Sequence, residues 1–211
     1  MKLFLSSENL GKYSEVFVEL IGSSKSVLYV GNAKDYLTAK ERAAKVNEHR
    51  QQFEALGLKF TELDLRDYFD NKVRPNILDG YSIVWCSGGN TFLLRAALLH
   101  SGLDRILVDT VTEGTIAYGG SSAGALVAGP TLKGAEHGDD PNAVKEIYDY
   151  DIEWSGLELV SVVCVPHCDS DWFGKSAAQM ITALASADIP YIALNDGQVY
   201  LVDGANARLL V

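Results

Sequence analysis

The chain has 211 residues, of which 47% are hydrophobic and 22% are charged, a balance typical of a globular protein. Lys and Arg number 18 against 28 Asp and Glu, and the resulting net charge of −10 would repel a nucleic-acid backbone. The longest apolar runs, such as residues 157–165, are shorter than the roughly 20 residues that span a bilayer. We therefore expect no nucleic-acid partner and no membrane partner, and we expect one domain over residues 1–211.

The first residues and the cysteines favour a cytoplasmic protein. Residues 1–11 resemble a first strand and lack the longer apolar core and the cleavage site of a signal peptide. The cysteines are Cys86, Cys164 and Cys168, an odd number that is explained most simply by reduced thiols. Two of them bracket His167 as C-x-x-H-C, but no second pair with ligand spacing lies nearby, so we expect no metal and no cofactor.

Short β-branched runs alternate along the chain with longer helical patterns. Helices are predicted over residues 35–57, 91–102 and about 172–187, with Ala39, Ala43, Val46 and Phe53 forming the apolar face of the first. Strands are predicted at residues 2–5, 26–30, 59–63, 83–86, 115–119, 160–165, 191–194 and 198–202. This alternation predicts an α/β fold with a mostly parallel sheet and helices on both faces.

Residues 120–124 match the pattern G-x-S-x-G, with an apolar strand before it and a small-residue helical segment after it. A nucleophile on such a strand-to-helix turn needs small neighbours, because the backbone is strained there. The pattern makes Ser122 a candidate nucleophile and the N–H of Ala123 a candidate oxyanion donor, with the following helix dipole adding to it. The alternative is a Gly/Ser-rich turn that only packs a helix close to a strand.

A serine nucleophile needs a base, which is usually histidine. His167 follows the strand predicted at residues 160–165, at its carboxyl end, where ligand and catalytic groups gather in parallel sheets. His49 lies in a charged helix and His100 at the end of another, where a cation is simply favoured. His137 lies in the acidic segment 131–156 and stays open. A histidine that only caps a strand end is the alternative for His167.

An orienting carboxylate would hold the histidine in the required tautomer. Asp196 lies between the last two predicted strands, and its alternative is a plain Asp-Gly hairpin turn. Asp139 and Asp140, in the irregular acidic segment after the serine, compete with it, and we expect that segment to belong to the site. The order of the residues along the chain is compatible with Asp139 or with Asp196 as the third member.

A second glycine motif, S-G-G-N-T-F-L-L, occupies residues 87–94. Backbone N–H groups in this turn are able to complete an oxyanion hole with Ala123. The alternative is a glycine-rich strand-to-helix turn in which Asn90 caps the helix. Neither dinucleotide nor P-loop glycine patterns occur in the chain.

Together these segments resemble the peptidase E (S51) family of serine peptidases, which includes aspartyl dipeptidases and cyanophycinases. The resemblance is carried by residues 88–91, 120–130, 166–167 and 196–197, in the order found in the family. It implies a fold like that of class I glutamine amidotransferases, with a serine in place of their nucleophilic cysteine.

The resemblance also implies a role for each site residue. Ser122 would be the nucleophile, His167 the general base and Asp196 the orienting carboxylate. The backbone amides of Gly89 and Ala123 would be the oxyanion donors. The resemblance further implies that Asn90 contacts the substrate, and that Asp139 is the counterpart of an acidic residue counted as functional in relatives.

One departure from the family bears on specificity. Aspartyl dipeptidases carry an arginine after the histidine that pairs with the substrate aspartate, whereas residues 167–180 contain only Lys175 as a cation, together with Asp169 and Asp171. We expect a peptidase acting on dipeptides or short peptides with a free N-terminus, with a weakened preference for aspartate. The alternatives are an α/β-hydrolase-type esterase or amidase using Ser122, Asp139 and His167, and a non-catalytic binding protein. The partner is a small peptide substrate, and the chain is expected to be a monomer or a homodimer.

Overall fold

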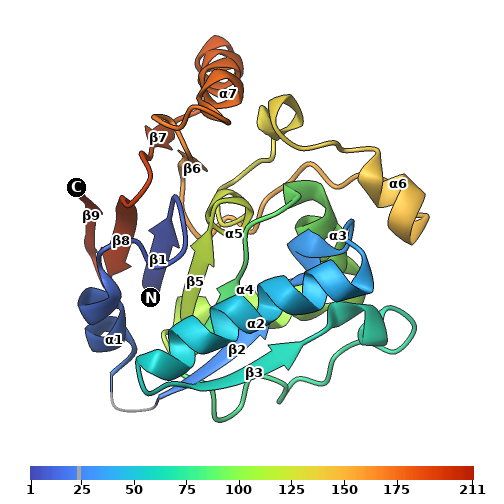
Figure 1. Cartoon of the computed structure of the whole chain (residues 1–211), viewed down its shortest axis with the longest axis vertical. Helices are drawn as coiled ribbons and strands as arrows, with labels where there is room; N and C mark the ends of the chain where they lie inside the picture. Colours follow the sequence, from blue (N-terminus) through green and yellow to red (C-terminus); the bar gives the residue numbers. More distant parts are fainter. Residues whose placement is uncertain (23–24) are drawn as a thin grey trace.

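The computed structural model describes residues 1–22 and 25–211 and is built around a seven-stranded sheet with the order β3-β2-β4-β5-β1-β8-β9 (Figure 1). The strands from β3 to β1 are parallel, whereas β8 pairs antiparallel with β1 and β9 pairs antiparallel with β8. The bounds are β1 (Lys2–Ser6), β2 (Ser26–Val30), β3 (Lys59–Leu63), β4 (Ile83–Cys86), β5 (Ala117–Ser121), β8 (Val199–Asp203) and β9 (Asn206–Leu210).

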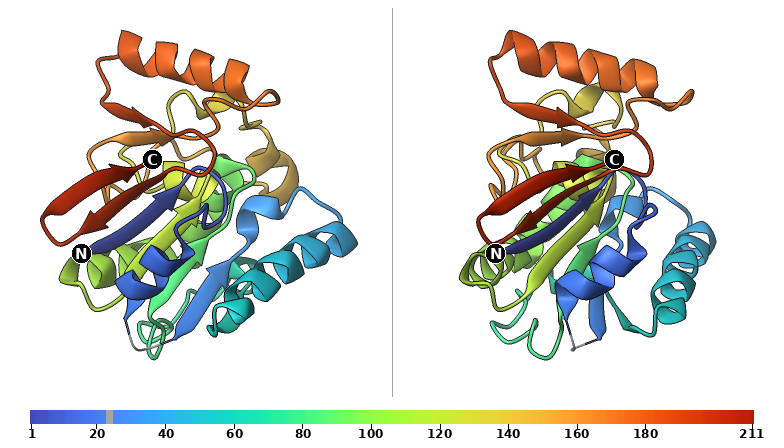
Figure 2. Two further views of the ribbon diagram at one scale, coloured as in Figure 1. Left: turned by 60° about the vertical axis from the view of Figure 1, so that its left-hand side comes forward. Right: turned by 90° about the vertical axis from the view of Figure 1, so that its left-hand side faces the viewer.

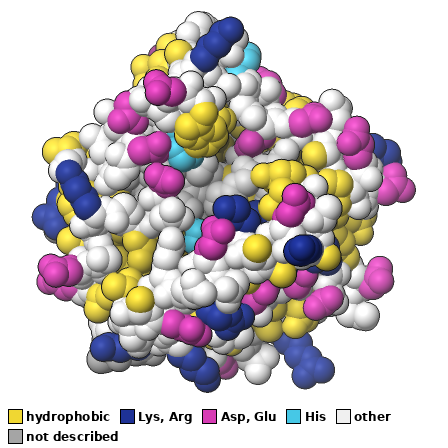
Figure 3. Space-filling model, viewed as in Figure 1, with side chains coloured by type: hydrophobic (Ala, Val, Ile, Leu, Met, Phe, Trp, Pro, Cys, Tyr) yellow, Lys and Arg dark blue, Asp and Glu magenta, His cyan; other side chains and the backbone are white. Residues whose placement is uncertain are grey.

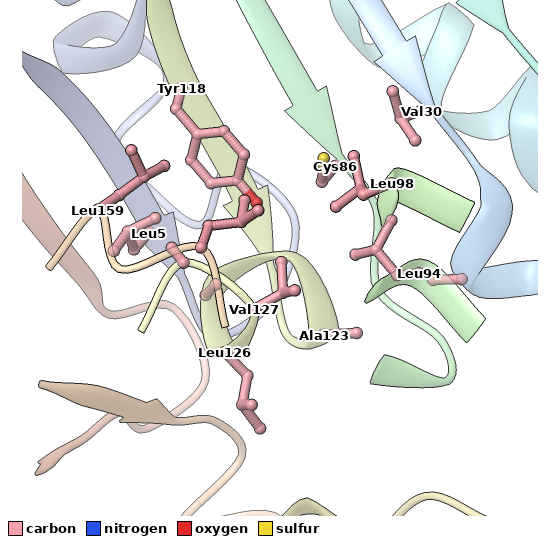
Figure 4. Packing of buried hydrophobic residues seen from close by; sticks show 14 of the residues in the cluster. Leu5, Val30, Cys86, Leu94, Leu98, Tyr118, Ala123, Leu126, Val127 and Leu159 are labelled. Atoms are coloured by element: carbon pink, nitrogen blue, oxygen red, sulfur yellow. The ribbon is translucent and has the colours of Figure 1, made fainter. Parts of the chain in front are cut away.

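Helices cover both faces of this sheet, which confirms the predicted fold class (Figure 1). Side chains alternate along each strand, so that Leu3 and Leu5 enter one core while Phe4 enters the other. The Phe4 core is closed by α1 (Ser14–Ile21) and α2 (Ala39–Ala55). The opposite core is closed by α3 (Thr91–Ser101), α4 (Leu103–Glu113) and α5 (Ala123–Leu126), and Figure 4 shows α5 packed beneath Tyr118.

The predicted strands agree with the observed ones to within a few residues, but helices α1, α4 and α6 (Ala143–Tyr148), strand β9 and the short 3-10 helices were missed. Helix α4 follows α3 directly, because Gly102 in the left-handed conformation ends one helix and begins the next. The strand predicted at residues 115–119 runs instead over Ala117–Ser121, because Ser121 still pairs with Ser6 of β1. This shift brings the end of β5 to the candidate nucleophile.

The predicted apolar face of α2 was partly wrong. The helix begins at Ala39 because Thr38 and Glu41 form a capping box, so residues 35–38 lie outside it. Its buried stripe contains Arg42, Val46, His49 and Phe53, whereas Ala39 and Ala43 are exposed. Arg42 is able to enter this stripe because Asp35 and Glu62 neutralise it at 2.8 and 2.7 Å.

The strands β6 (Val163–Val165) and β7 (Tyr191–Ala193) form a separate two-stranded parallel sheet. Figure 2 shows this small sheet and α7 (Gly174–Ser186) stacked at one end of the main sheet. Because β7 and β8 belong to different sheets, the Asp196–Gly197 turn is not the hairpin that its sequence allowed. His167 likewise follows a strand of the small sheet, not of the main sheet as the position argument had assumed.

The remaining elements are short and surround the carboxyl ends of the main strands. They are η1 (Asn32–Lys34), η2 (Leu65–Tyr68), η3 (Ala135–His137) and α6 (Ala143–Tyr148). Tyr148 of α6 donates a hydrogen bond of 2.5 Å to Asp35, which ties the acidic segment to the loop after η1. Within the described residues, no helix is long and apolar enough to cross a membrane.

Candidate active site

Ser122 lies between β5 and α5 with φ 52° and ψ −110°, a strained conformation for a residue other than glycine. Its N–H donates to the carbonyl of Ser6 at 3.0 Å, which fixes the turn against the end of β1. The observed geometry is that of a nucleophile elbow, which lifts the serine hydroxyl out of the sheet.

The glycines on either side of Ser122 are required by contact distances. A Cβ on Gly120 would lie 2.5 Å from the carbonyl carbon of Gly124, and a Cβ on Gly124 would lie 2.1 Å from the oxygen of Cys86. Close packing therefore explains both glycines, and it also makes the tight turn at Ser122 possible. Because α5 contains only 4 residues, we expect little of the helix-dipole contribution that the sequence suggested.

The side chains of Ser122, His167 and Asp196 form a continuous hydrogen-bonded chain. The Nε2 atom of His167 is 3.0 Å from Oγ of Ser122, and its Nδ1 atom is 2.6 Å from Oδ1 of Asp196. His167 is 4% exposed, and its ring is flanked by Trp172 and Phe173 at centroid distances of 4.7 and 5.5 Å. A proton on Nδ1 that is donated to Asp196 leaves Nε2 free to accept the serine proton.

Ser7, which directly follows β1, stabilises this series of hydrogen bonds. The sequence did not predict its role. Its buried hydroxyl accepts the backbone N–H of His167 at 2.8 Å and donates to Oδ1 of Asp196 at 2.9 Å. Asp169 adds a second brace by accepting the N–H of Asp196 at 2.8 Å. The only sequence signal for Ser7 was its place at the carboxyl end of a parallel strand.

Asp139 does not occupy the position beside His167. Its Oδ2 atom accepts the N–H and the hydroxyl of Thr91 at 2.9 and 2.6 Å, at the start of α3. Burial raises the pKa of the Asp139 carboxyl, and the hydrogen bonds from Thr91 oppose that rise. The order Ser122–Asp139–His167 that the sequence left open is therefore not the one the structure assembles.

Among the described residues, His167 is the histidine that contacts the Ser122 hydroxyl, although His49 lines the same cavity. His49 is buried beside the ring of Tyr29, and burial lowers its pKa to about 4. His100 stacks on Tyr150 at a centroid distance of 3.5 Å. His137 is exposed and lines a separate depression together with Lys175.

The glycine turn after β4 lies directly against Ser122, the candidate nucleophile. A Cβ on Gly88 would be 3.1 Å from Cβ of Ser122, and a Cβ on Gly89 would be 2.2 Å from the oxygen of Ala33. Gly89 also has φ 141°, so only glycine fits there. In the described part of the chain, the N–H groups of Gly89 and Ala123 have no protein acceptor.

Asn90 has the structural role that the sequence offered as an alternative. Its Oδ1 atom caps α3 by accepting the N–H of Leu93 at 3.0 Å, and its Nδ2 atom donates to the carbonyl of Asp140 at 2.8 Å. Asn90 also lines the cavity over Ser122, and its contact with a substrate stays a prediction.

A cavity of about 1210 Å³ opens over these groups. Figure 3 shows the hollow near the middle of this face, rimmed by acidic, basic, histidine and hydrophobic side chains. The acidic segment supplies part of its wall through α6 and the residues before it, as expected from the sequence. The charged residues of the lining are Glu8, Lys34, Lys45, Glu48, Asp139, Asp140 and Glu146.

Known proteins with similar sequences are peptidases. An uncharacterized peptidase of Listeria innocua is 27% identical over 161 residues, which cover 74% of this chain and 71% of the relative. An uncharacterized peptidase of Pasteurella multocida is 26% identical over 204 residues, which cover 96% of this chain and 93% of the relative.

The fold comparison agrees with the sequence comparison. A crystal structure from Listeria monocytogenes EGD-e, assigned provisionally to peptidase E, superposes with a TM-score of 0.77 at 22% identity, over 99% of this chain and 97% of the other. At 22% identity, this similarity shows that the two proteins share a fold. The profile of peptidase family S51 matches residues 3–210, and the chain therefore belongs to this family of peptidases.

Proposed function

We propose that the protein is a serine peptidase that hydrolyses dipeptides or short peptides at a free N-terminal residue, through an acyl-enzyme on Ser122. The observation that carries this proposal is the chain of contacts from Ser122 through His167 to Asp196, at 3.0 and 2.6 Å. Such a relay converts a weakly nucleophilic hydroxyl into one able to attack an amide carbonyl.

The proton transfers follow from the observed contacts. Nε2 of His167 takes the proton of Ser122 as Oγ bonds to the substrate carbonyl carbon, and Asp196 stabilises the imidazolium that forms. The carbonyl oxygen becomes an oxyanion, which the N–H groups of Gly89 and Ala123 stabilise. His167 then returns the proton to the departing amine, leaving the acyl group on Ser122.

Deacylation repeats the same steps with water. His167 takes a proton from the water as its oxygen bonds to the acyl carbon, and a second oxyanion forms in the same place. Collapse of this intermediate breaks the bond to Oγ, and His167 returns the proton to Ser122. The product carboxylate then leaves an enzyme in its starting protonation state.

The charges of the cavity support a substrate with a free N-terminal ammonium. Asp139 uses Oδ2 for both of its bonds to Thr91, so Oδ1 is left to accept an ammonium proton. Asp140 and Glu146 lie on the same wall and add negative potential there. The cavity, enclosed in part by α6, also suits a short peptide better than a long chain.

The weakened aspartate preference rests on the missing arginine. Among the described residues that line the cavity there is no arginine, and Lys175 lines a different depression. Asp169 accepts the N–H of Asp196 and so helps to position that carboxylate. We therefore give less weight to repulsion between Asp169 and an acidic substrate.

A panel of dipeptides with acidic and neutral first residues tests the proposal, with Ser122→Ala assayed beside the wild type. We expect hydrolysis that the variant loses, with Ala-X and Asp-X peptides turned over at comparable rates. Strict cleavage of Asp-X peptides would show that the argument from the missing arginine is wrong. If no peptide of the panel is hydrolysed and a fluorophosphonate probe does not label Ser122, the results would favour a non-catalytic binding protein.

A further inference from the structure

Lys34 is a buried cation in the wall of the active-site cavity that the proposed mechanism does not use. It ends η1 and is 8% exposed, yet it lies among the residues that line the cavity over Ser122. Its ammonium donates to the carbonyl oxygen of Gly88. Gly88 in turn lies against Ser122, so Lys34 contacts the turn that packs on the proposed nucleophile.

Among the described residues, Lys34 differs from the buried Arg42 and Arg95 because it has no carboxylate partner. Arg42 is paired with Asp35 at 2.8 Å, and Arg95 is paired with Asp104 at 3.1 Å. None of the ion pairs found across residues 1–22 and 25–211 includes Lys34. An ammonium has three donors, and buried charges are normally paired, so this cation has unused capacity for an anion.

The electrostatic surroundings agree with this deficit of negative charge. Burial lowers the pKa of Lys34 to about 8, with Lys45 and Arg42 contributing and Glu48 opposing. His49 also lies beside it, but with a pKa of about 4 it is neutral at pH 7. Lys34 is therefore mostly charged at neutral pH, and a bound anion would stabilise that charge.

We propose that Lys34 binds a carboxylate of the substrate and so determines which peptides the enzyme accepts. This inference rests on the proposed function and names the group that the cavity selects. A dipeptide offers two carboxylates within reach of a site beside the scissile bond: the C-terminal carboxylate, and the side chain of an N-terminal Asp or Glu. Both present the same chemistry to an ammonium.

Paired peptides distinguish these two sources. Ala-Ala is compared with its C-terminal amide, and Asp-Ala is compared with Asn-Ala, on the wild type, Lys34→Met and Lys45→Met. Methionine keeps most of the unbranched, apolar part of the side chain and lacks the ammonium. Lys45 is a matched control because it lines the same cavity but is exposed and already paired with Glu48 at 3.0 Å.

We expect the wild type to favour Ala-Ala over its amide at least tenfold in KM, and Lys34→Met to abolish that preference while Lys45→Met keeps it. A preference for Asp-Ala over Asn-Ala that Lys34→Met abolishes would assign the site to the side-chain carboxylate and overturn the expectation of comparable Ala-X and Asp-X turnover. The preference should also decline above about pH 8, because the ammonium of Lys34 loses its proton there. An equal loss on both members of each pair would overturn the proposal and leave Lys34 only as a support for Gly88.

Calorimetric titration of the Ser122→Ala protein, with and without Lys34→Met, separates this proposal from the proposed function. Carboxylate-dependent affinity that requires Lys34 supports the binding role whether or not the wild type turns the peptide over. Affinity that ignores the carboxylate overturns it. Turnover by the wild type tests the peptidase chemistry separately.

Discussion

Replacing Asp196 by asparagine removes the negative charge beside His167 and keeps the shape of the side chain. Oδ1 of Asp196 accepts hydrogen bonds from both Nδ1 of His167 and the hydroxyl of Ser7. The hydroxyl of Ser7 accepts the N–H of His167, and its own proton has Asp196 as an acceptor at 2.9 Å and the carbonyl of Leu194 at 3.4 Å, so the shorter contact favours Asp196. An asparagine oxygen in the same place satisfies both donors, so the imidazole keeps its tautomer and the loss is electrostatic.

The size of that loss follows from the charge separation in the transition state. With Nδ1 and Oδ1 at 2.6 Å, the two charge centres lie about 4 Å apart, which corresponds to about 4 kcal/mol at an effective dielectric constant near 20. Each 1.4 kcal/mol is about tenfold in rate, so this energy corresponds to a factor of about 10³. Because the side chain of Asp196 is 28% exposed, water reduces the effect, and we expect kcat to fall by about 10² to 10³.

The assay measures kcat on the dipeptide of the panel that is hydrolysed fastest. Ser122→Ala gives the background rate, and Asp139→Asn is the matched control. Asp139→Asn should raise KM and change kcat less than about tenfold, because that carboxylate contacts Thr91 and not His167. The reasoning is refuted if Asp139→Asn costs more in kcat than Asp196→Asn, or if Asp196→Asn stays within tenfold of the wild type. Circular dichroism on each variant checks that the fold is intact.

Three further substitutions test the supports of the site. Ser7→Ala should lower kcat about tenfold and alter the pH–rate profile, because it removes hydrogen bonds worth about 1 kcal/mol each to His167 and Asp196. Ser7→Thr keeps the hydroxyl and should restore both kcat and the profile. An unchanged pH–rate profile in Ser7→Ala would contradict the supporting role of Ser7. Gly124→Ala should fail to fold or melt far lower, since its Cβ would lie 2.1 Å from the oxygen of Cys86, and a wild-type melting curve would show that the backbone yields there. Tyr148→Phe removes one partly buried hydrogen bond and should lower Tm by about 2–6 °C in a thermal melt, whereas an equal Tm would mean that this bond adds no net stability.

Much of the fold follows from local sequence patterns. Most strands of the parallel sheet are short, largely apolar runs, and the alternation of such runs with helical segments favours a parallel sheet with helices on both faces. Pairing between distant segments is not encoded locally. The runs that form β6 and β7 have the same composition as the others, and only the path of the chain sends them to a separate sheet. The α2 stripe was misjudged for a similar reason, since Arg42 is buried only because Asp35 and Glu62 meet it in space.

The sequence by itself made Ser122 the candidate nucleophile, because a nucleophile elbow needs small residues at fixed spacing, and that requirement is contained within five neighbouring positions. The tertiary structure decided between Asp196 and Asp139, because separation along the chain carries no information on distance to His167. It also supplied Ser7 and Lys34, which belong to no motif. Their importance comes from burial and from partners that lie far away in the sequence, and these exist only once the strands have met at a common edge.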